Sequence, residues 1–235
     1  MENILYQVVN DICLMQDKVH DGECIRYNFI SMPRYIENFK HIVEVKDKIQ
    51  YTADIGTGWG VMALAVKYLG KDAIAIDFWK DKSELFDLLE IPLYLKNIEL
   101  GMPPELLKGQ FDCVMFCEIL EHLNFSPVFV LQEINKMLRP GGYIIISTPN
   151  NEEWNLKELM EHNDVSYLTA GGNMRIDADV LKIPKAKPGD AFFDGHTRHY
   201  VGEEIIRLLK YTGFKVDKIK YILDKKYIDI RGIKI

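Results

Sequence analysis

The segment YTADIGTGWG, which begins at Tyr51, constrains the fold more than any other part of the chain. A short run of strand-forming residues is followed by three glycines at alternate positions, Gly56, Gly58 and Gly60. Glycine permits sharp turns and lets a ligand approach the backbone where a Cβ would collide. The next apolar run ends at the acidic residue Asp77. This order of elements is typical of an α/β domain that binds an adenosine-containing cofactor: a strand, a glycine turn, a helix, a second strand and an acidic residue.

Short apolar runs alternate with helical patterns after this motif. Strands are expected near 51–55, 73–77, 92–96, 111–116 and 142–147, and helices near 60–69, 82–89 and 127–138. This alternation predicts βαβ units in a parallel sheet with helices on both faces. Two strand-like runs near the C-terminus, 214–222 and 226–233, are close enough to pair in antiparallel fashion. The predicted fold class is therefore α/β, a doubly wound, mostly parallel Rossmann-like sheet with an antiparallel C-terminal strand pair.

The rest of the chain divides around this core. Apolar residues at helical spacing predict a helical N-terminal segment over residues 1–47, followed by the main domain over 48–235. Pro140, Gly141 and Gly142 are expected to stop a helix that reaches 138–139 and to turn the chain into the next strand. Residues 150–200 break the alternation with scattered Asn, Gly and Pro, which indicates an insertion, and we expect this insertion to shape a binding pocket.

Composition limits the class of protein. A chain of 235 residues with 48% hydrophobic content can bury a substantial core. The net charge of −6 provides no general attraction for nucleic acid or for anionic membranes, so neither is expected as a partner. Four irregularly spaced cysteines suit reduced packing residues better than disulfides, and the N-terminus lacks the pattern of a signal peptide. A cytoplasmic location is the resulting expectation.

The glycine spacing and the two acids indicate what the turn binds. In a dinucleotide fold the third glycine stands three residues after the second, whereas here the separation is two, which argues against a pyrophosphate ligand. Asp54 directly precedes the turn and would disfavour a phosphate, but its carboxylate can pair with a cationic amino group. Asp77 lies 21 residues after Gly56, the distance at which an acid reaches a ribose diol. Phe78 and Trp79 offer flat apolar surface beside an adenine ring.

Five blocks in order make the sequence resemble the class I S-adenosylmethionine-dependent methyltransferases, in the branch that modifies small molecules. The blocks are the glycine motif with Asp54, Asp77, residues 111–114, residues 118–123 and residues 138–142. A late match over residues 196–200, followed by a helix and Gly213, extends the resemblance to the branch that acts on quinone precursors and sugars. The resemblance implies S-adenosylmethionine as cofactor, with the glycine turn on its methionine part, Asp77 on the ribose, and residues after the third strand on the adenine.

The cofactor-binding residues predicted on these grounds come from four places in the chain. They are Asp54, Gly56, Thr57, Gly58, Gly60, Asp77, Phe78, Trp79, Asn97, Ile98 and Glu118. Asp77 has a purely structural alternative as a helix cap. Many members of the resembled family have an aspartate after the third strand, so the adenine contact through Asn97, Ile98 or Glu99 departs from their pattern.

Two further clusters carry side chains suited to catalysis. Glu118, Glu121 and His122 would share one face of a helix, and for the last two a capping role is the main alternative. His196 and His199 are the predicted catalytic residues, because an imidazole near neutrality can deprotonate a hydroxyl or an amine. Arg198 and Tyr200 are predicted to bind substrate, although this segment could equally serve to pack the insertion onto the core. A metal site is not expected, since a His-x-x-His pair needs a further ligand.

These observations predict methyl transfer from S-adenosylmethionine to an oxygen, or less favourably a nitrogen, of a small polar metabolite. A sugar or sugar derivative is the favoured acceptor, because the late histidine-rich block resembles methyltransferases of polysaccharide pathways. Two alternatives from other classes stay open: a catalytically silent S-adenosylmethionine-binding sensor or partner subunit, and a nicotinamide-dependent oxidoreductase. The sequence leaves the oligomeric state open, with a homodimer as one option.

Overall fold

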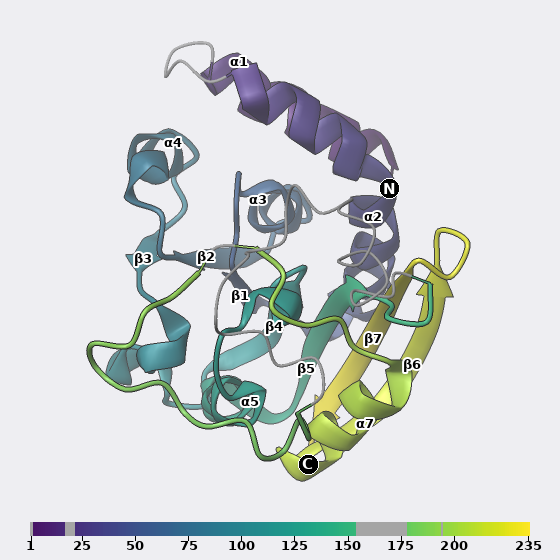
Figure 1. The fold of residues 1–235 in the computed structure, drawn as a ribbon. Coiled ribbons are helices and arrows are strands. Elements are labelled where there is room, and N and C mark those ends of the chain that lie inside the picture. The colour runs from purple at the N-terminus through teal and green to yellow at the C-terminus, as the bar shows by residue number, and fades with distance from the viewer. Residues whose placement is uncertain (1, 17–21, 154–177, 194) are drawn as a thin grey trace. The chain divides into compact units, whose positions relative to one another are not determined.

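The computed structural model of the chain describes residues 2–16, 22–153, 178–193 and 195–235. Seven strands form one sheet in the order β3-β2-β1-β4-β5-β7-β6 (Figure 1). The described residues divide into two compact units, Met1–Lys96 with Phe111–Met115, and Asn97–Gln110 with Phe116–Ile235. The predicted α/β class, with a mostly parallel sheet and an antiparallel C-terminal pair, is confirmed.

The first unit holds the N-terminal helices and the strands around the glycine motif. Its elements are α1 (Glu2–Gln16), α2 (Gly22–Val45), η1 (Lys46–Lys48), β1 (Tyr51–Ile55), α3 (Val61–Tyr68), β2 (Asp72–Asp77), η2 (Lys80–Lys82), α4 (Ser83–Leu88), β3 (Leu93–Leu95) and most of β4 (Phe111–Cys117). β1 pairs in parallel with β2 and with β4, and β2 pairs in parallel with β3. Helices α1 and α2 lie in the N-terminal segment predicted to be helical, and α1 packs against α2, α3 and α4.

The core of this unit follows from the apolar runs. Residues 52–55 of β1 and 73–77 of β2 are buried, as expected for strands covered on both faces. The first six residues of α3, VMALAV, are all buried, so this helix is apolar on every side and lies within the unit. The sheet and α3 together fix the turn that joins β1 to α3.

The second unit contains the C-terminal part of the sheet. Its elements are η3 (Ile98–Leu100), η4 (Pro104–Leu106), the end of β4, η5 (Leu120–His122), α5 (Pro127–Met137), β5 (Leu138–Pro149), α7 (Gly202–Tyr211), β6 (Phe214–Ile222) and β7 (Tyr227–Lys234). β7 pairs antiparallel with both β5 and β6, which confirms the predicted C-terminal pair. The amphipathic helix α7 buries Ile205, Leu208 and Leu209 and contacts α5 and β6.

One predicted boundary is wrong. The helix before Pro140 ends at Met137, and β5 already begins at Leu138 instead of near 142. Leu138 has extended backbone angles, φ −78° and ψ 142°, so the chain turns into the strand before the Pro-Gly-Gly sequence. The ammonium of Lys234 donates to the carbonyl oxygens of Asn135 (2.7 Å) and Leu138 (2.8 Å), which satisfies acceptors at this helix end.

About half of the predicted insertion, residues 154–177 and 194, lies outside the described residues. Its described parts carry one isolated bridge, between Asn150 and Tyr200, and the elements of residues 178–193 and 195–199 are turns and bends (Figure 1). The division into a helical segment 1–47 and a domain 48–235 stays a prediction. Among the helices that the structure describes, none has the length and apolar character needed to cross a bilayer.

Candidate active site

The turn after β1 adopts the conformation that its glycines permit. Gly56, Gly58 and Gly60 have φ angles of 67°, 56° and 79°, in the left-handed region that disfavours residues with a Cβ. The Gly56 N–H donates to the Ile76 carbonyl at 2.8 Å, which ties the turn to β2. A Cβ at Gly58 would meet no heavy atom within 4 Å, whereas one at Gly60 would lie 3.2 Å from Phe86. The backbone at Gly58 is therefore open to an approaching ligand.

Asp77 at the end of β2 joins this turn by a hydrogen bond. Its Oδ2 accepts from the Gly58 N–H at 3.0 Å, and its Oδ1 accepts from the N–H groups of Phe78 (2.7 Å) and Trp79 (3.2 Å). A carboxylate offers about four lone-pair directions, so three bonds still permit a ribose hydroxyl to donate a fourth. Asp77 does not cap a helix as its structural alternative proposed, because the N-cap of the next helical turn, η2, is Trp79 and has no side-chain hydrogen bond. The bonds of Asp77 to the turn are compatible with the predicted ribose contact, which stays a prediction.

Asp54 lies buried beneath the turn. Its Oδ2 accepts a hydrogen bond from the Thr57 hydroxyl at 2.7 Å, and the Ala63 N–H also donates to the carboxyl group. Burial raises the pKa of the Asp54 carboxyl to about 7, and these two hydrogen bonds only partly oppose that rise. Asp54 is therefore a carboxyl that changes its charge near neutral pH. A cationic ligand group beside it would favour the ionised form.

Phe78 and Trp79 form the aromatic surface predicted beside the second strand. Their side chains are 54% and 43% exposed, and their ring centroids lie 4.9 Å apart. An exposed pair of rings directly after the acid is suited to contact with a planar base. The adenine contact of both rings stays a prediction.

The side chains of Asn97 and Glu99, after the third strand, accept hydrogen bonds from backbone N–H groups. The Asn97 side chain accepts from the Glu99 N–H at 3.0 Å and so caps η3, and Ile98 is buried. The buried carboxyl of Glu99 accepts from the N–H groups of Asn124 (3.2 Å) and Phe125 (2.6 Å), while burial raises its pKa. The adenine contact of this segment stays a prediction, and no pattern in the sequence indicated that Glu99 fixes the loop at 124–125.

Glu118 has a strained backbone at the end of β4. Its φ of 58° places a residue with a Cβ in the left-handed region, at a cost of about 1–3 kcal/mol. Two bonds to Ser147 hold it there: the Glu118 N–H donates to the Ser147 carbonyl, and the Ser147 hydroxyl donates to Oε1, each at 2.8 Å. The helix expected over residues 118–122 is absent. Only the 3₁₀ turn η5, Leu120–His122, forms, because Glu118 leaves the right-handed region.

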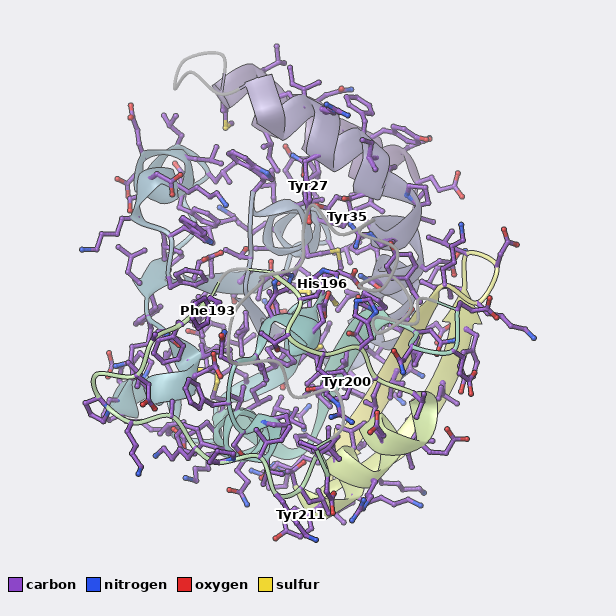
Figure 2. All side chains as sticks on the ribbon, in the orientation of Figure 1. Tyr27, Tyr35, Phe193, His196, Tyr200 and Tyr211 are labelled. Carbon is purple, nitrogen blue, oxygen red and sulfur yellow. The ribbon has the colours of Figure 1, made fainter. Side chains whose placement is uncertain are left out.

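Three imidazoles lie together in the second unit. His196, labelled in Figure 2, has its Nδ1 2.7 Å from Nε2 of His199, and its ring meets the His122 ring edge-on with centroids 4.8 Å apart. Glu121 stands beside them, and its Oε2 accepts from the Thr148 hydroxyl at 2.8 Å. The sequence predicted the pair His196 and His199, but it did not join them to His122, which is 74 residues away from His196.

Arg198 and Tyr200 are buried in the structure. Arg198 is 5% exposed, donates to the Ala178 carbonyl at 2.8 Å, and pairs with the Glu204 carboxylate. Its guanidinium lies over the ring of Tyr200. Tyr200, which is labelled in Figure 2, is 1% exposed, and burial raises the pKa of its phenol. These contacts suit the packing alternative. The predicted substrate contacts of both residues stay predictions.

Comparison with known proteins identifies the family of this arrangement. A family model described as a methyltransferase domain matches residues 33–219, which is most of the chain. The chain belongs to this methyltransferase family. The match confirms the sequence-based identification of an S-adenosylmethionine-dependent methyltransferase, and S-adenosylmethionine is the cofactor that the family implies.

Curated relatives of this methyltransferase are named for oxygen methylation. It is 31% identical over 113 residues to a ubiquinone biosynthesis O-methyltransferase of Shewanella pealeana, an alignment that covers 46% of each chain. The corresponding protein of Pseudomonas aeruginosa is 29% identical over 101 residues, which are 41% of this chain and 43% of the relative. The chain thus spans less than half the length of the curated relatives it matches.

Solved structures share the fold at low sequence identity. An S-adenosylmethionine-dependent methyltransferase of Thermotoga maritima has a TM-score of 0.61 at 16% identity and covers 91% of this chain and 95% of its own. The N-methyltransferase NodS of Bradyrhizobium japonicum, solved with S-adenosylhomocysteine, has a TM-score of 0.59 at 12% identity over 97% and 98% of the two chains. At these identities the likeness establishes the fold alone.

Proposed function

We propose that this methyltransferase transfers a methyl group from S-adenosylmethionine to a hydroxyl oxygen of a small polar molecule. The observation that carries the proposal is the Asp77 carboxylate, which accepts the Gly58 N–H at 3.0 Å and so fixes the acid against an open glycine turn. An acid held at this position suits a ribose diol. The two-residue step from Gly58 to Gly60 argues against the pyrophosphate of a nicotinamide cofactor.

The choice of oxygen over nitrogen is supported by the names of the curated relatives. Those relatives are O-methyltransferases of ubiquinone biosynthesis, so hydroxylated quinone precursors are the first acceptors to test. The family model, the curated relatives and the solved structures give no support to the sugar acceptor expected from the sequence. It therefore stays an untested prediction and enters the assay as a second acceptor class.

The roles of the residues follow from the chemistry of the reaction. Bound S-adenosylmethionine supplies the methyl group and takes the electron pair of the broken C–S bond on sulfur. Asp77 and the glycine turn hold the nucleoside, and the carboxylate of Asp54 attracts the positively charged amino group. The acceptor oxygen must lose its proton. The cluster of His122, His196 and His199 is the proposed place for that step, since an imidazole can take the proton or hold a cation that acidifies the hydroxyl.

A transfer assay tests the proposal. The purified chain is incubated with S-adenosylmethionine labelled in its methyl group and with two acceptor panels, hydroxylated aromatic rings and sugars. We expect label to move to a ring hydroxyl together with release of S-adenosylhomocysteine. Calorimetry with S-adenosylmethionine, S-adenosylhomocysteine and NADH accompanies the assay. Tight binding of NADH alone would support the oxidoreductase alternative, and cofactor binding without transfer to any acceptor would support the silent binder.

A further inference from the structure

We infer that Glu121, His122 and His196 form a binding site for one divalent transition-metal ion, for which Zn²⁺ fits the ligands best. One ligand atom from each of the three side chains lies within 4.8 Å of the other two. All three residues belong to the second unit, so the distances among them lie within one compact unit. The binding inference stands on its own, and only its catalytic consequence rests on the proposed methyl transfer.

The separation of the ligand atoms is close to what a bound ion needs. Zinc binds imidazole nitrogen and carboxylate oxygen at about 2.0–2.2 Å, which places ligand atoms roughly 3–4 Å apart. Side-chain adjustments of about an ångström are therefore enough to close the site. Two of the three ligands are imidazoles, which favour zinc and related transition metals over Ca²⁺ or Mg²⁺, whereas a carboxylate oxygen can bind all of these ions.

The hydrogen bond of His122 orients that imidazole for coordination. Its Nδ1 lies 3.1 Å from the Gly195 carbonyl oxygen. Because a carbonyl oxygen only accepts, Nδ1 must donate and therefore carries the proton. In the neutral ring the lone pair is then on Nε2. A backbone carbonyl that fixes the tautomer in this way is the usual outer partner of a metal-binding histidine.

His196 is oriented in a similar way by His199. Its Nδ1 makes the 2.7 Å contact with Nε2 of the buried His199, so Nε2 of His196 is the nitrogen that we assign to the ion. A hydrogen bond to one ring nitrogen sets the direction of the other. His199 is then a positioning residue, because it acts on the ion only through His196.

Glu121 supplies a carboxylate, and hydrogen bonds hold both its side chain and its backbone. Its Oε2 accepts from the Thr148 hydroxyl at 2.8 Å, and its backbone carbonyl accepts the Thr197 N–H at 2.8 Å. Its side chain is buried, at 1% exposure. A carboxylate at such a position is costly as an anion unless positive charge compensates it, and a bound cation would add that charge.

The segment that carries His196 is attached closely to the loop that carries the other two ligands. Asn124 and Phe193 exchange two hydrogen bonds, from the Asn124 side-chain amide to the Phe193 carbonyl (3.1 Å) and from the Phe193 N–H to the Asn124 side-chain oxygen (2.9 Å). The Thr197 hydroxyl also donates to the Leu123 carbonyl at 2.6 Å. Bonds on both sides of His196 fix its distance from His122, and metal sites need such preorganisation.

The catalytic consequence follows from the number of ligands. A tetrahedral ion with three protein ligands keeps a fourth position, which an acceptor hydroxyl can occupy. Coordination lowers the pKa of that hydroxyl and releases its proton to solvent, so His196 need not act as the base.

Metal titration of the full chain tests the inference. A tag-free preparation is treated with a chelator, dialysed and titrated with Co²⁺, whose visible absorption reports nitrogen and oxygen coordination, and Zn²⁺ is then added in competition. We expect one equivalent to bind. His122→Ala, His196→Ala and Glu121→Gln should each weaken binding at least about tenfold. The matched control Glu105→Gln changes an exposed carboxylate of the same unit and should bind as the wild type does.

The positioning role of His199 has its own test. His199→Ala should weaken Co²⁺ binding by about 10–100-fold, and His199→Gln, which can keep a hydrogen bond to His196, should restore most of the affinity. Thermal melting and S-adenosylhomocysteine binding verify that each variant is folded. Wild-type protein that binds no stoichiometric Co²⁺, or His122 and His196 variants that bind it equally well, would overturn the inference. In that event, preserved methyl transfer would leave the proposed function intact.

Discussion

Asp54→Asn should uncouple both stability and cofactor binding from pH near neutrality. In the folded protein burial raises the pKa of Asp54 from 3.8 to about 7, whereas an unfolded chain has the ordinary value. Between these two values the unfolded state loses its proton while the folded state keeps it. The stability of the wild type should therefore fall as pH rises from about 4 to about 7, and it should level off above 7.

The magnitude follows from the shift. About three pKa units correspond to roughly 4 kcal/mol as an upper bound, of which roughly 2–3 kcal/mol falls between pH 5 and pH 8. The amide introduced by Asp54→Asn keeps both local bonds, because its oxygen can accept from the Ala63 N–H and its NH₂ group can donate to the Thr57 hydroxyl. Urea denaturation of both proteins at pH 5 and pH 8, followed by circular dichroism, measures the difference. Parallel pH dependence in the two proteins would refute the reasoning.

The same variant tests the proposed contact with the cofactor amino group. If the bound cofactor requires ionised Asp54, calorimetry of the wild type should give an affinity roughly five- to tenfold weaker at pH 6 than at pH 7.5. Asp54→Asn should bind more weakly at pH 7.5 and lose most of this pH dependence. A variant with the full affinity and the full pH dependence of the wild type would exclude Asp54 from the contact.

Three further substitutions test separate parts of the site. Gly58→Ala should cost about 1–2 kcal/mol of stability in urea denaturation, since φ is 56°, and should weaken cofactor binding because the new Cβ enters the open space; unchanged binding would mean that no ligand approaches there. Trp79→Ala should weaken S-adenosylhomocysteine binding about two- to tenfold by calorimetry through lost stacking, and an unchanged affinity would remove Trp79 from the adenine site. Glu99→Gln should lower stability by about 1–3 kcal/mol in urea, because an amide nitrogen would face the Phe125 N–H; an unchanged midpoint would contradict that role.

The sheet and the cofactor turn could be predicted from the sequence because their signals are local. Strands buried on both faces are continuous apolar runs, and β1, β2 and β4 lie within one or two residues of the expected ranges. The three glycines have positive φ because the turn needs it, and Asp77 follows its strand directly. Each of these features depends on neighbours a few residues away.

The parts that the sequence did not reveal depend on distant contacts. Glutamate has no preference for positive φ, and two hydrogen bonds with the distant Ser147 hold Glu118 in that conformation, after which no α-helix follows. The helix expected to reach 138–139 ends at Met137, since Leu138 already has extended backbone angles. The approach of His122 to His196 joins residues from separate regions of the sequence. Spacing alone could not bring them together.

The most direct measurement of the central claim is the affinity of three proteins for S-adenosylhomocysteine, determined by calorimetry at pH 7.5. The wild type should bind one equivalent, and Asp77→Ala should bind at least about tenfold more weakly because the ribose contact and the bond to Gly58 are both lost. Asp81→Ala, which removes an exposed carboxylate four residues later in the chain, should bind as the wild type does. Equal affinity in all three proteins, or no binding by the wild type, would contradict the assignment of this turn and acid to the cofactor.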